Sequence, residues 1–323
     1  MKIDHYLKAL NEAFAQTSYG EQPNELYEPI RYLMSLGGKR MRPLLTLMAA
    51  SMFTDDWQKA LKPAMAVEVF HNFTLMHDDI MDQAPLRRGK PTVHAKWNPN
   101  VAILSGDVML VCAYELLLDV PSAQLKTVLR RFNRTAAEVC EGQQWDMNFE
   151  NEALVSEADY LMMIRLKTAV LLGFALELGG IIAEANETIC TLLYEIGVNI
   201  GVGFQLKDDI LDVYGDAAKF GKQVGGDIIA NKKTLLLIEA LNSAEGAIKE
   251  ELDRWLQAQS FDPVAKVAAV TAIYDQLGIK AKAEHLMNHY FEKAFAAIEA
   301  LPLEPARKEP LRAFAAWLIE RES

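Results

Sequence analysis

The sequence has few cysteines, and none in a metal-site spacing. Its three, Cys112, Cys140 and Cys190, are odd in number and far apart, so neither a disulfide framework nor a zinc site is expected. The stretch MKIDHYLKAL also lacks the unbroken apolar core of a signal peptide. Both features predict a chain that works in a reducing cytoplasm.

Positive charge is also in short supply. Lys and Arg number 33 against 44 Asp and Glu, which gives a formal net charge of -11. This balance argues against nonspecific nucleic-acid binding, which needs a basic face to replace counterions around phosphates. The closest approach to a membrane span, residues 168–183, carries Glu177 in its middle. We therefore expect a buried core helix there, no nucleic-acid partner and no stable membrane insertion.

Proline and β-type patterns are missing from the middle of the chain. No proline occurs between Pro121 and Pro263, and apolar residues there recur at three- and four-residue spacing. Alternating runs bounded by Asn-Gly or Asp-Gly turns are not evident. Segments such as VAILSGDVMLVCAYELLLD are hydrophobic nearly all round, as in the inner helices of a bundle. The predicted fold is all-α, a single large helical bundle forming one domain over residues 1–323.

The segment DDIMD, residues 78–82, follows an apolar helical run. Asp78 and Asp82 are four residues apart, so on a helix they share one face about 6 Å apart along the axis, with Asp79 beside them. Hard oxygen ligands without Cys or clustered His favour Mg²⁺ over Zn²⁺. One copy of this motif is explained at least as well by an acidic, solvated helix face.

A second copy occurs in GFQLKDDILDVYGD, where Asp208, Asp209 and Asp212 repeat the arrangement on another apolar helical run. Two inward-facing acidic clusters repel each other unless strong positive charge lies between them. Several Mg²⁺ ions that bridge a diphosphate would supply it. The repeat therefore favours a metal-diphosphate site over two surface patches.

Basic residues occur in several short groups along the chain. LGGKRMRP, residues 36–43, places a flexible glycine pair before three cations that can converge on a ligand, although a helix-entry loop with solvated charges has the same pattern. The pair Arg87 and Arg88, followed by Gly89, supplies planar donors suited to phosphate oxygens. Further polar residues near helix ends or glycine-rich loops are Lys167, Thr168, Lys222 and Lys232.

His71 precedes Asp78 by seven residues, nearly two helical turns, so it shares that face and can donate to a phosphate. A core histidine with its hydrogen bonds satisfied fits the sequence equally well.

Six motifs then occur in a recognisable order: GGKRMRP, HDDIMD with RRG, EGQQWD, LKT, GFQLKDDILD, and a GK...GGD...NKKT stretch over residues 221–234. Together they resemble the trans-isoprenyl diphosphate synthase family over about residues 30 to 235. The resemblance implies the isoprenoid synthase fold, with roughly ten or more helices around a central apolar cavity, and a homodimer.

The resemblance also implies roles for residues at the matching positions. Metal binding would fall to Asp78, Asp82 and Asp208, with about three Mg²⁺ ions per active site. The catalytic set would be Asp78, Asp79, Asp82, Lys167, Thr168, Gln205, Asp208, Asp209 and Asp212. Isopentenyl diphosphate would bind Lys39, Arg42, His71 and Arg88. The allylic diphosphate would bind Arg87, Lys167, Thr168, Gln205, Lys222 and Lys232.

One motif departs from the family. Where the family often has Gly-Lys-Ser/Thr-Thr-Pro, this chain has Asn231-Lys232-Lys233-Thr234-Leu235. Either lysine can therefore be the one that contacts phosphate.

The implied reaction joins isopentenyl diphosphate head to tail with dimethylallyl, geranyl or farnesyl diphosphate, by ionisation, condensation and elimination. Product length should depend on the residues below the first motif. Phe73 lies five residues before Asp78, about 7.5 Å along the helix, and the small Thr74 lies in the Asp78 and Asp82 stripe. The combination of Phe73, the small Thr74 and no insertion within DDIMD resembles short-chain members that make C15 to C20 products, with C20 ahead of C15. Phe73 as plain core packing remains open.

Three other functions fit parts of this pattern. A longer-chain polyprenyl diphosphate synthase would share every motif. A noncatalytic helical subunit of a prenyl synthase should have lost an aspartate or a phosphate-binding cation, and neither loss is seen. A class I terpene cyclase usually carries an NSE/DTE-like second metal motif, in place of the second DDxxD found here.

Overall fold

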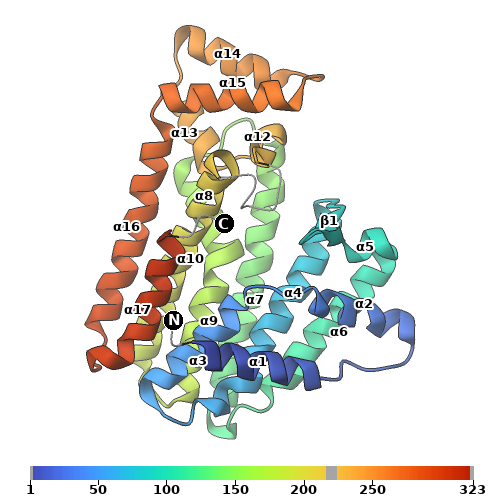
Figure 1. The fold of residues 1–323 in the computed structure, drawn as a ribbon, viewed down its shortest axis with the longest axis vertical. Coiled ribbons are helices and arrows are strands. Elements are labelled where there is room, and N and C mark those ends of the chain that lie inside the picture. The colour runs from blue at the N-terminus through green and yellow to red at the C-terminus, as the bar shows by residue number, and fades with distance from the viewer. Residues whose placement is uncertain (1–2, 216–223, 321–323) are drawn as a thin grey trace. The chain divides into compact units, whose positions relative to one another are not determined.

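The structure is a computed structural model that describes residues 3–215 and 224–320. Helices account for most of the described chain (Figure 1), which confirms the all-α prediction. Two short strands form a single antiparallel hairpin. The elements in chain order are α1 (Asp4–Gln16), α2 (Asn24–Ser35), α3 (Met41–Phe53), η1 (Trp57–Ala60), α4 (Leu61–Met81), β1 (Leu86–Arg87), β2 (Lys90–Pro91), α5 (Val93–Lys96), α6 (Pro99–Leu117), α7 (Ser122–Asn151), α8 (Glu157–Ile164), η2 (Arg165–Ala169), α9 (Val170–Ile182), α10 (Glu187–Tyr214), α12 (Gly226–Ile229), α13 (Leu235–Ser243), α14 (Gly246–Gln257), α15 (Pro263–Gln276), α16 (Ile279–Ala300) and α17 (Pro305–Glu320).

Contacts between residues divide the chain into two compact units. Unit 1 comprises Met1–Ala136, Leu171–Gly197 and Ile298–Ala313, and unit 2 comprises Ala137–Val170, Val198–Ala297 and Phe314–Ser323. The long helices α7 and α10 contribute residues to both units. The expectation of one domain over residues 1–323 stays a prediction.

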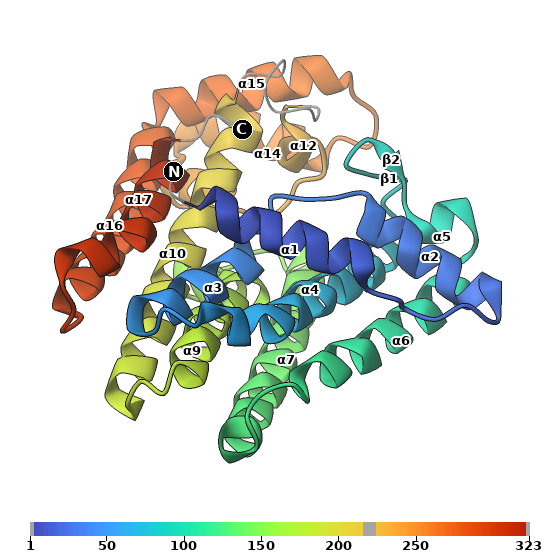
Figure 2. The ribbon, with the colours of Figure 1, turned by 60° about the horizontal axis from the view of Figure 1, so that its bottom comes forward.

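Helix α4 lies at the core of unit 1. It packs against α3 and α6 (Figures 1 and 2). Every residue from Pro63 to Phe70 is buried, including the charged Glu68. Each large apolar side chain buried in this way stabilises the fold by about 1.5–3 kcal/mol. The packing fixes the direction of α4, and therefore where the aspartates at its C-terminal end lie.

Helix α9 contains most of the apolar run that the sequence assigns to the core. It packs so closely on α3 that a Cβ at Gly179 would lie only 2.2 Å from the Thr46 carbonyl oxygen. All of its residues from Val170 to Ile182 are buried, as predicted, and Glu177 is 3% exposed.

Two other helices, α6 and α10, are long and apolar enough to cross a membrane by length and composition alone. Core helices of soluble proteins pass the same test, so this property by itself does not indicate a membrane protein. In α6 only 33% of the most apolar window is buried, so this helix presents an apolar face outside the core of unit 1.

In unit 2, α15 packs against α12 and α14. The Lys266 side chain, on α15, is fully buried, and its Nζ donates to the Ile229 carbonyl at 3.2 Å and to Asn231 Oδ1 at 2.6 Å. A cation at the C-terminal end of α12 interacts favourably with the last carbonyls of that helix. This contact fixes the segment that leads into Lys232.

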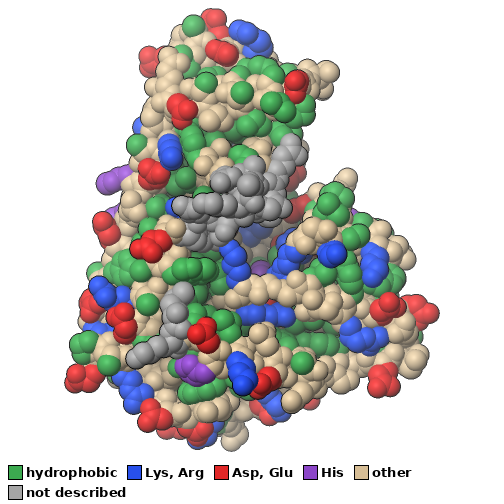
Figure 3. Space-filling view, in the orientation of Figure 1, with side chains coloured by type: hydrophobic (Ala, Val, Ile, Leu, Met, Phe, Trp, Pro, Cys, Tyr) green, Lys and Arg blue, Asp and Glu red, His purple; other side chains and the backbone are tan. Residues whose placement is uncertain are grey.

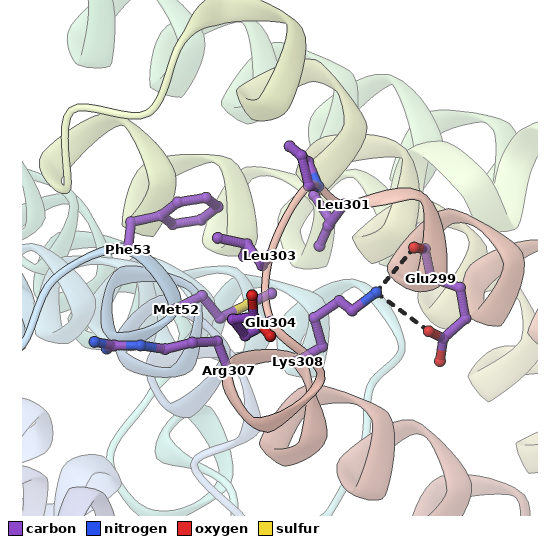
Figure 4. Close-up of a pocket in the computed structure, with 9 residues that line it drawn as sticks. Met52, Phe53, Glu299, Leu301, Leu303, Glu304, Arg307 and Lys308 are labelled. Carbon is purple, nitrogen blue, oxygen red and sulfur yellow. Dashed lines mark hydrogen bonds and ion pairs between the residues drawn. The ribbon is translucent and has the colours of Figure 1, made fainter.

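A groove of about 700 Å³ lies in unit 1, between the C-terminal end of α3 and the turn that joins α16 to α17 (Figure 4). Lys308 reaches across to the backbone and the carboxylate of Glu299, at 2.9 and 3.2 Å. None of the site residues predicted from the sequence lines this groove. Its lining residues are Met52, Phe53, Glu299, Leu301, Pro302, Leu303, Glu304, Arg307 and Lys308.

Candidate active site

The first aspartate motif lies at the C-terminal end of α4. Asp82 follows the last helical residue with helical dihedrals, φ -79° and ψ -4°, and its N–H donates to the Asp78 carbonyl oxygen at 2.8 Å. Asp78 and Asp82 therefore lie one helical turn apart on one face, as the spacing predicts. Asp78 is half-buried and Asp82 exposed, whereas Asp79 is only 2% exposed.

Asp79 and Arg87 form a bidentate ion pair. Arg87 Nε donates to both carboxylate oxygens at 2.9 Å, and one terminal nitrogen donates to Oδ1 at 2.7 Å. The planar guanidinium matches a carboxylate in this way, which makes the geometry rigid. Asp79 therefore supports the motif by holding Arg87.

Arg87 and Arg88 lie in the hairpin formed by β1 and β2. The two turn residues, Arg88 and Gly89, have φ of 53° and 71°, which is the pattern of a type I′ turn. An Arg88 terminal nitrogen donates to the Gly37 carbonyl oxygen. A Cβ at Gly38 would lie 2.9 Å from Arg88, so the glycine pair lets this arginine approach the loop that carries Lys39.

The same loop leads into Arg42, which donates to His71 Nε2 at 3.0 Å. Arginine can only donate, so Nε2 accepts, and a hydrogen bond from His71 to a phosphate would have to come from Nδ1. Burial, with the charges of Arg42 and Arg88, holds the pKa of His71 well below its usual range. Lys39 is exposed, and Lys and Arg side chains gather on the visible face of the part of unit 1 that contains α2, β1 and α5 (Figure 3).

An aromatic cluster surrounds the predicted chain-length residues. The Phe73 ring lies 5.7 Å from Phe70 and 4.8 Å, edge to face, from His77. His77 Nε2 also lies 3.1 Å from the Ile103 carbonyl oxygen on α6. The hydroxyl of Thr74 donates to the carbonyl of the residue three positions earlier, at 2.8 Å. The sequence assigns no role to His77, yet its ring packs directly on Phe73.

The second aspartate motif belongs to unit 2 and lies in α10. Asp208 and Asp212 are again one turn apart and half-buried, and Asp209 is 4% exposed. Asp209 accepts from the Tyr160 hydroxyl and from Gln205 Nε2, the latter at 3.1 Å. Burial, more than any neighbour, raises the pKa of Asp209 to about 8. The middle aspartates of both motifs are therefore held by protein groups.

Lys167 and Thr168 lie in η2, a π-helical turn, an irregularity often found at functional sites. The Thr168 hydroxyl donates to Gln205 Oε1 at 3.2 Å, so a hydrogen-bond chain runs from Thr168 through Gln205 to Asp209. A Cβ at Gly142, in the EGQQWD motif, would lie 2.2 Å from the Lys167 backbone nitrogen. That glycine allows α7 to approach the π-helical turn.

Asp146, the last residue of EGQQWD, brings two predicted phosphate ligands together. Its carboxylate lies 2.5 Å from Lys167 Nζ and 3.8 Å from Lys232 Nζ. Burial alone would raise the pKa of Asp146, but the two lysines outweigh it and lower the pKa. The sequence gives Asp146 no role, although it lies in a quoted motif. Lys222 lies outside the described residues.

Among residues 3–215 and 224–320, no group of three or more His, Cys, Asp or Glu side chains is placed to hold a metal ion. Each motif instead offers two carboxylates one turn apart. Mg²⁺ keeps several waters and is typically bound by one or two carboxylates together with substrate phosphates. The donor set therefore fits Mg²⁺ that arrives with a diphosphate.

The predicted residues thus form two sets. Unit 1 brings together Arg42 with His71, Arg88 with the glycine loop, and Arg87 with Asp79. Unit 2 brings together Thr168, Gln205 and Asp209, and places Lys167 and Lys232 on Asp146. The roles assigned to these residues stay predictions.

Two aspartate pairs and grouped cations on an all-helical fold indicate an enzyme that acts on diphosphates. The family model for polyprenyl synthetase matches residues 23–275. The chain belongs to the polyprenyl synthetase family.

Three proteins illustrate the similarity. The geranylgeranyl pyrophosphate synthase of Geoglobus acetivorans is 36% identical over 317 residues, covering 98% of this chain and 97% of that protein. A crystal structure of a geranylgeranyl pyrophosphate synthase superposes with a TM-score of 0.92 at 44% identity, covering 98% of this chain and 99% of that one. The geranylfarnesyl diphosphate synthase of Aeropyrum pernix is 34% identical over 329 residues, with 99% of each chain covered.

Proposed function

We propose that this chain condenses isopentenyl diphosphate with an allylic diphosphate to give an all-trans prenyl diphosphate of C15 to C20. The chain is a trans-prenyltransferase of the polyprenyl synthetase family. The observation that carries the detailed proposal is the pair of aspartate motifs, each with two carboxylates one helical turn apart and each accompanied by its own set of cations. Dimethylallyl, geranyl and farnesyl diphosphate are the candidate allylic substrates.

We assign the cations of unit 1 to isopentenyl diphosphate. Arg88 is held on the glycine loop and Arg42 on His71, so both guanidinium groups have defined positions before a ligand binds. Lys39, from the same loop, would complete the site. Arginine forks in fixed positions suit diphosphate oxygens.

The allylic diphosphate is assigned to Lys167 and Lys232, together with Arg87 and the aspartate pairs. Lys232, and not Lys233, pairs with the Asp146 carboxylate, which Lys167 also contacts. This contact favours Lys232 as the phosphate ligand. Thr168 and Gln205 lie in the adjoining hydrogen-bond chain. Lys222 stays in the proposal on the resemblance alone.

We propose Mg²⁺ as the metal, held by Asp78, Asp82 and Asp208, with about three ions per active site. The buried Asp79 and Asp209 support the motifs, because their oxygens already accept protein hydrogen bonds. When bound, Mg²⁺ neutralises charge on the departing diphosphate.

The chain's own residues then have three tasks in the reaction. Lys167 and Lys232 hold the allylic diphosphate as its C–O bond breaks, and they stabilise the negative charge that develops on the bridging oxygen. Arg42 and Arg88 orient the isopentenyl double bond so that its electrons form the new C–C bond, and such positioning contributes several kcal/mol to catalysis. The Thr168 and Gln205 oxygens can stabilise the allylic cation by their dipoles, and the released diphosphate takes the proton.

Within the C15 to C20 range, C20 is the product that we propose. Phe73, which precedes Asp78 on α4 and lies in a cluster of aromatic rings, is the residue that we propose as the floor. The relatives named geranylgeranyl synthases support this length. A longer product is the second candidate, because a similar chain is named a geranylfarnesyl diphosphate synthase.

We further propose a homodimer formed through α6. Leu104 and Val111 of α6, and Leu118, which follows its last residue with helical dihedrals, are 59%, 66% and 55% exposed. Their seven-residue spacing places them on one helix face. The family resemblance implies a homodimer, and we propose that the second copy of the chain covers this face. A Val111→Asp variant should then run as a monomer in size-exclusion chromatography, where the wild type runs as a dimer.

We infer a soluble enzyme of the cytoplasm without stable membrane insertion. Solved crystal structures of similar chains, and the odd, separated cysteines, support this assignment.

The proposed function is tested by incubation with Mg²⁺, labelled isopentenyl diphosphate and each of the three allylic diphosphates, followed by chromatographic sizing of the products. We expect a labelled prenyl diphosphate that ends at C20. A volatile hydrocarbon would indicate cyclisation instead, and no incorporation with any starter would support the noncatalytic subunit.

A further inference from the structure

Arg40 differs from the other cations of its loop because it is buried. Its exposed fraction is 8%, while the adjacent Lys39 is exposed. Its φ of 49° lies in the left-handed region, which is unfavourable for a residue other than glycine unless the surroundings enforce it. The structure therefore holds Arg40 in place at some cost.

Three elements of unit 1 hold the guanidinium of Arg40. One terminal nitrogen donates to Glu68 Oε1 on α4 at 2.9 Å, and the other donates to the Met34 carbonyl oxygen on α2 at 3.1 Å. The group also lies over the Phe14 ring of α1, 4.5 Å from its centre. The contacts tie the loop between α2 and α3 to α4.

Glu68 lies one turn before His71 on α4 and is 2% exposed. Asn72 donates to the backbone carbonyl and the carboxylate of Glu68, at 2.8 and 3.4 Å. Oε1 of Glu68 thus accepts from both Arg40 and Asn72, and the carboxylate supplies negative charge beside a group of positive side chains. That group consists of Arg40, Arg42, Arg87 and Arg88, all of which act on the pKa of His71.

Four guanidinium groups in one region repel one another before a diphosphate binds. The structure counters this with two buried carboxylates, Glu68 on Arg40 and Asp79 on Arg87. Arg40 also precedes Arg42 by only two residues, so fixing Arg40 restricts the path of the backbone that carries Lys39 and Arg42.

We propose that Glu68 and Arg40 are a positioning pair for isopentenyl diphosphate. The pair holds the loop on α4, so that Lys39 and Arg42 converge beside His71 before the ligand arrives. Preorganisation of this kind strengthens binding because less ordering remains to be done on association. The inference rests on the proposed function for the identity of the ligand.

The test is calorimetric titration with isopentenyl diphosphate, which requires no turnover. Glu68→Gln keeps the shape of the side chain but removes its charge. We expect its Kd for isopentenyl diphosphate to rise about tenfold or more, equivalent to a loss of about 1.4 kcal/mol. The Kd for farnesyl diphosphate with Mg²⁺ should change by less than about twofold. Glu177→Gln is the matched control, because Glu177 is also a buried carboxylate of unit 1 bonded to an arginine, Arg131 at 3.1 Å.

A second variant separates positioning from stability. Replacing both partners, Arg40→Met with Glu68→Met, removes the buried charges together and should recover much of the Tm lost in Glu68→Gln. The proposal predicts that isopentenyl diphosphate binding stays weak in this double variant. Recovery of the Kd together with the Tm in the double variant would overturn the proposal. An unchanged Kd in Glu68→Gln would also overturn it, as would an equal loss of affinity for both diphosphates in that variant. A wild type that binds both diphosphates without turnover would overturn the proposed function and leave this test intact.

Discussion

Replacing Phe73 with alanine should lengthen the product by about one five-carbon unit. In the proposed reaction, the growing hydrocarbon chain extends from the allylic diphosphate at Asp78 toward the N-terminal part of α4, past Phe73. The ring of Phe73 packs against Phe70 and His77. Alanine would remove the Phe73 ring and leave the Phe70 ring beneath it.

The size of the effect follows from helix geometry. Phe70 precedes Phe73 by three residues, so the next ring lies about 4.5 Å deeper, close to the length of one isoprene unit. Phe70 is 1% exposed and has a second ring, Phe132, 5.0 Å from it, so this second floor should hold. The main product is expected to shift from C20 to C25, without a spread to much longer chains.

Products would be hydrolysed and sized by reversed-phase chromatography, with farnesyl diphosphate as the starter. Phe53→Ala is the control, because Phe53 is a half-buried phenylalanine of the same unit that lines the groove in Figure 4. It should leave product length unchanged. An unchanged product in Phe73→Ala, or the same lengthening in Phe53→Ala, would remove Phe73 as the floor.

Three further predictions concern buried polar groups. Burial, opposed by Arg131, raises the pKa of Glu177 from 4.5 to about 7. The free energy of unfolding should therefore be highest below about pH 4.5 and fall by about 3 kcal/mol as pH rises through about 7. Chemical unfolding of Glu177→Gln should lack this pH dependence. Tyr160→Phe removes a donor to the buried Asp209, so it should cost about 1–3 kcal/mol in unfolding free energy and raise the Mg²⁺ concentration needed for half-maximal turnover. Asp146→Asn should weaken the contacts that hold Lys167 and Lys232 together, so in steady-state kinetics its KM for the allylic diphosphate should be higher than that of the wild type. An equal KM in the two proteins would contradict the assignment.

The helical fold could be predicted because its signals are local. Apolar periodicity and the absence of proline between Pro121 and Pro263 indicate helices without knowledge of their partners. The one-turn spacing of Asp78 and Asp82 likewise follows from the spacing of residues alone.

Other features depended on contacts that spacing does not encode. The sequence places Asp79 and Asp209 within their motifs, but only the fold brings Arg87 to one and Tyr160 to the other. The π-helical turn at Lys167 packs against Gly142, which belongs to a different helix. Each of these features arises where tertiary contact overrides local preference.

The most direct test of the account is whether both aspartate motifs bind the same diphosphate. Mg²⁺-dependent binding of farnesyl diphosphate would be measured by calorimetry for the wild type, Asp78→Ala, Asp208→Ala and the double variant. If both motifs share one ligand, each single substitution removes most of the metal-dependent affinity and the double variant loses little more, because the two sites are coupled. Losses that simply add in the double variant, or near wild-type binding in either single variant, would contradict the shared site.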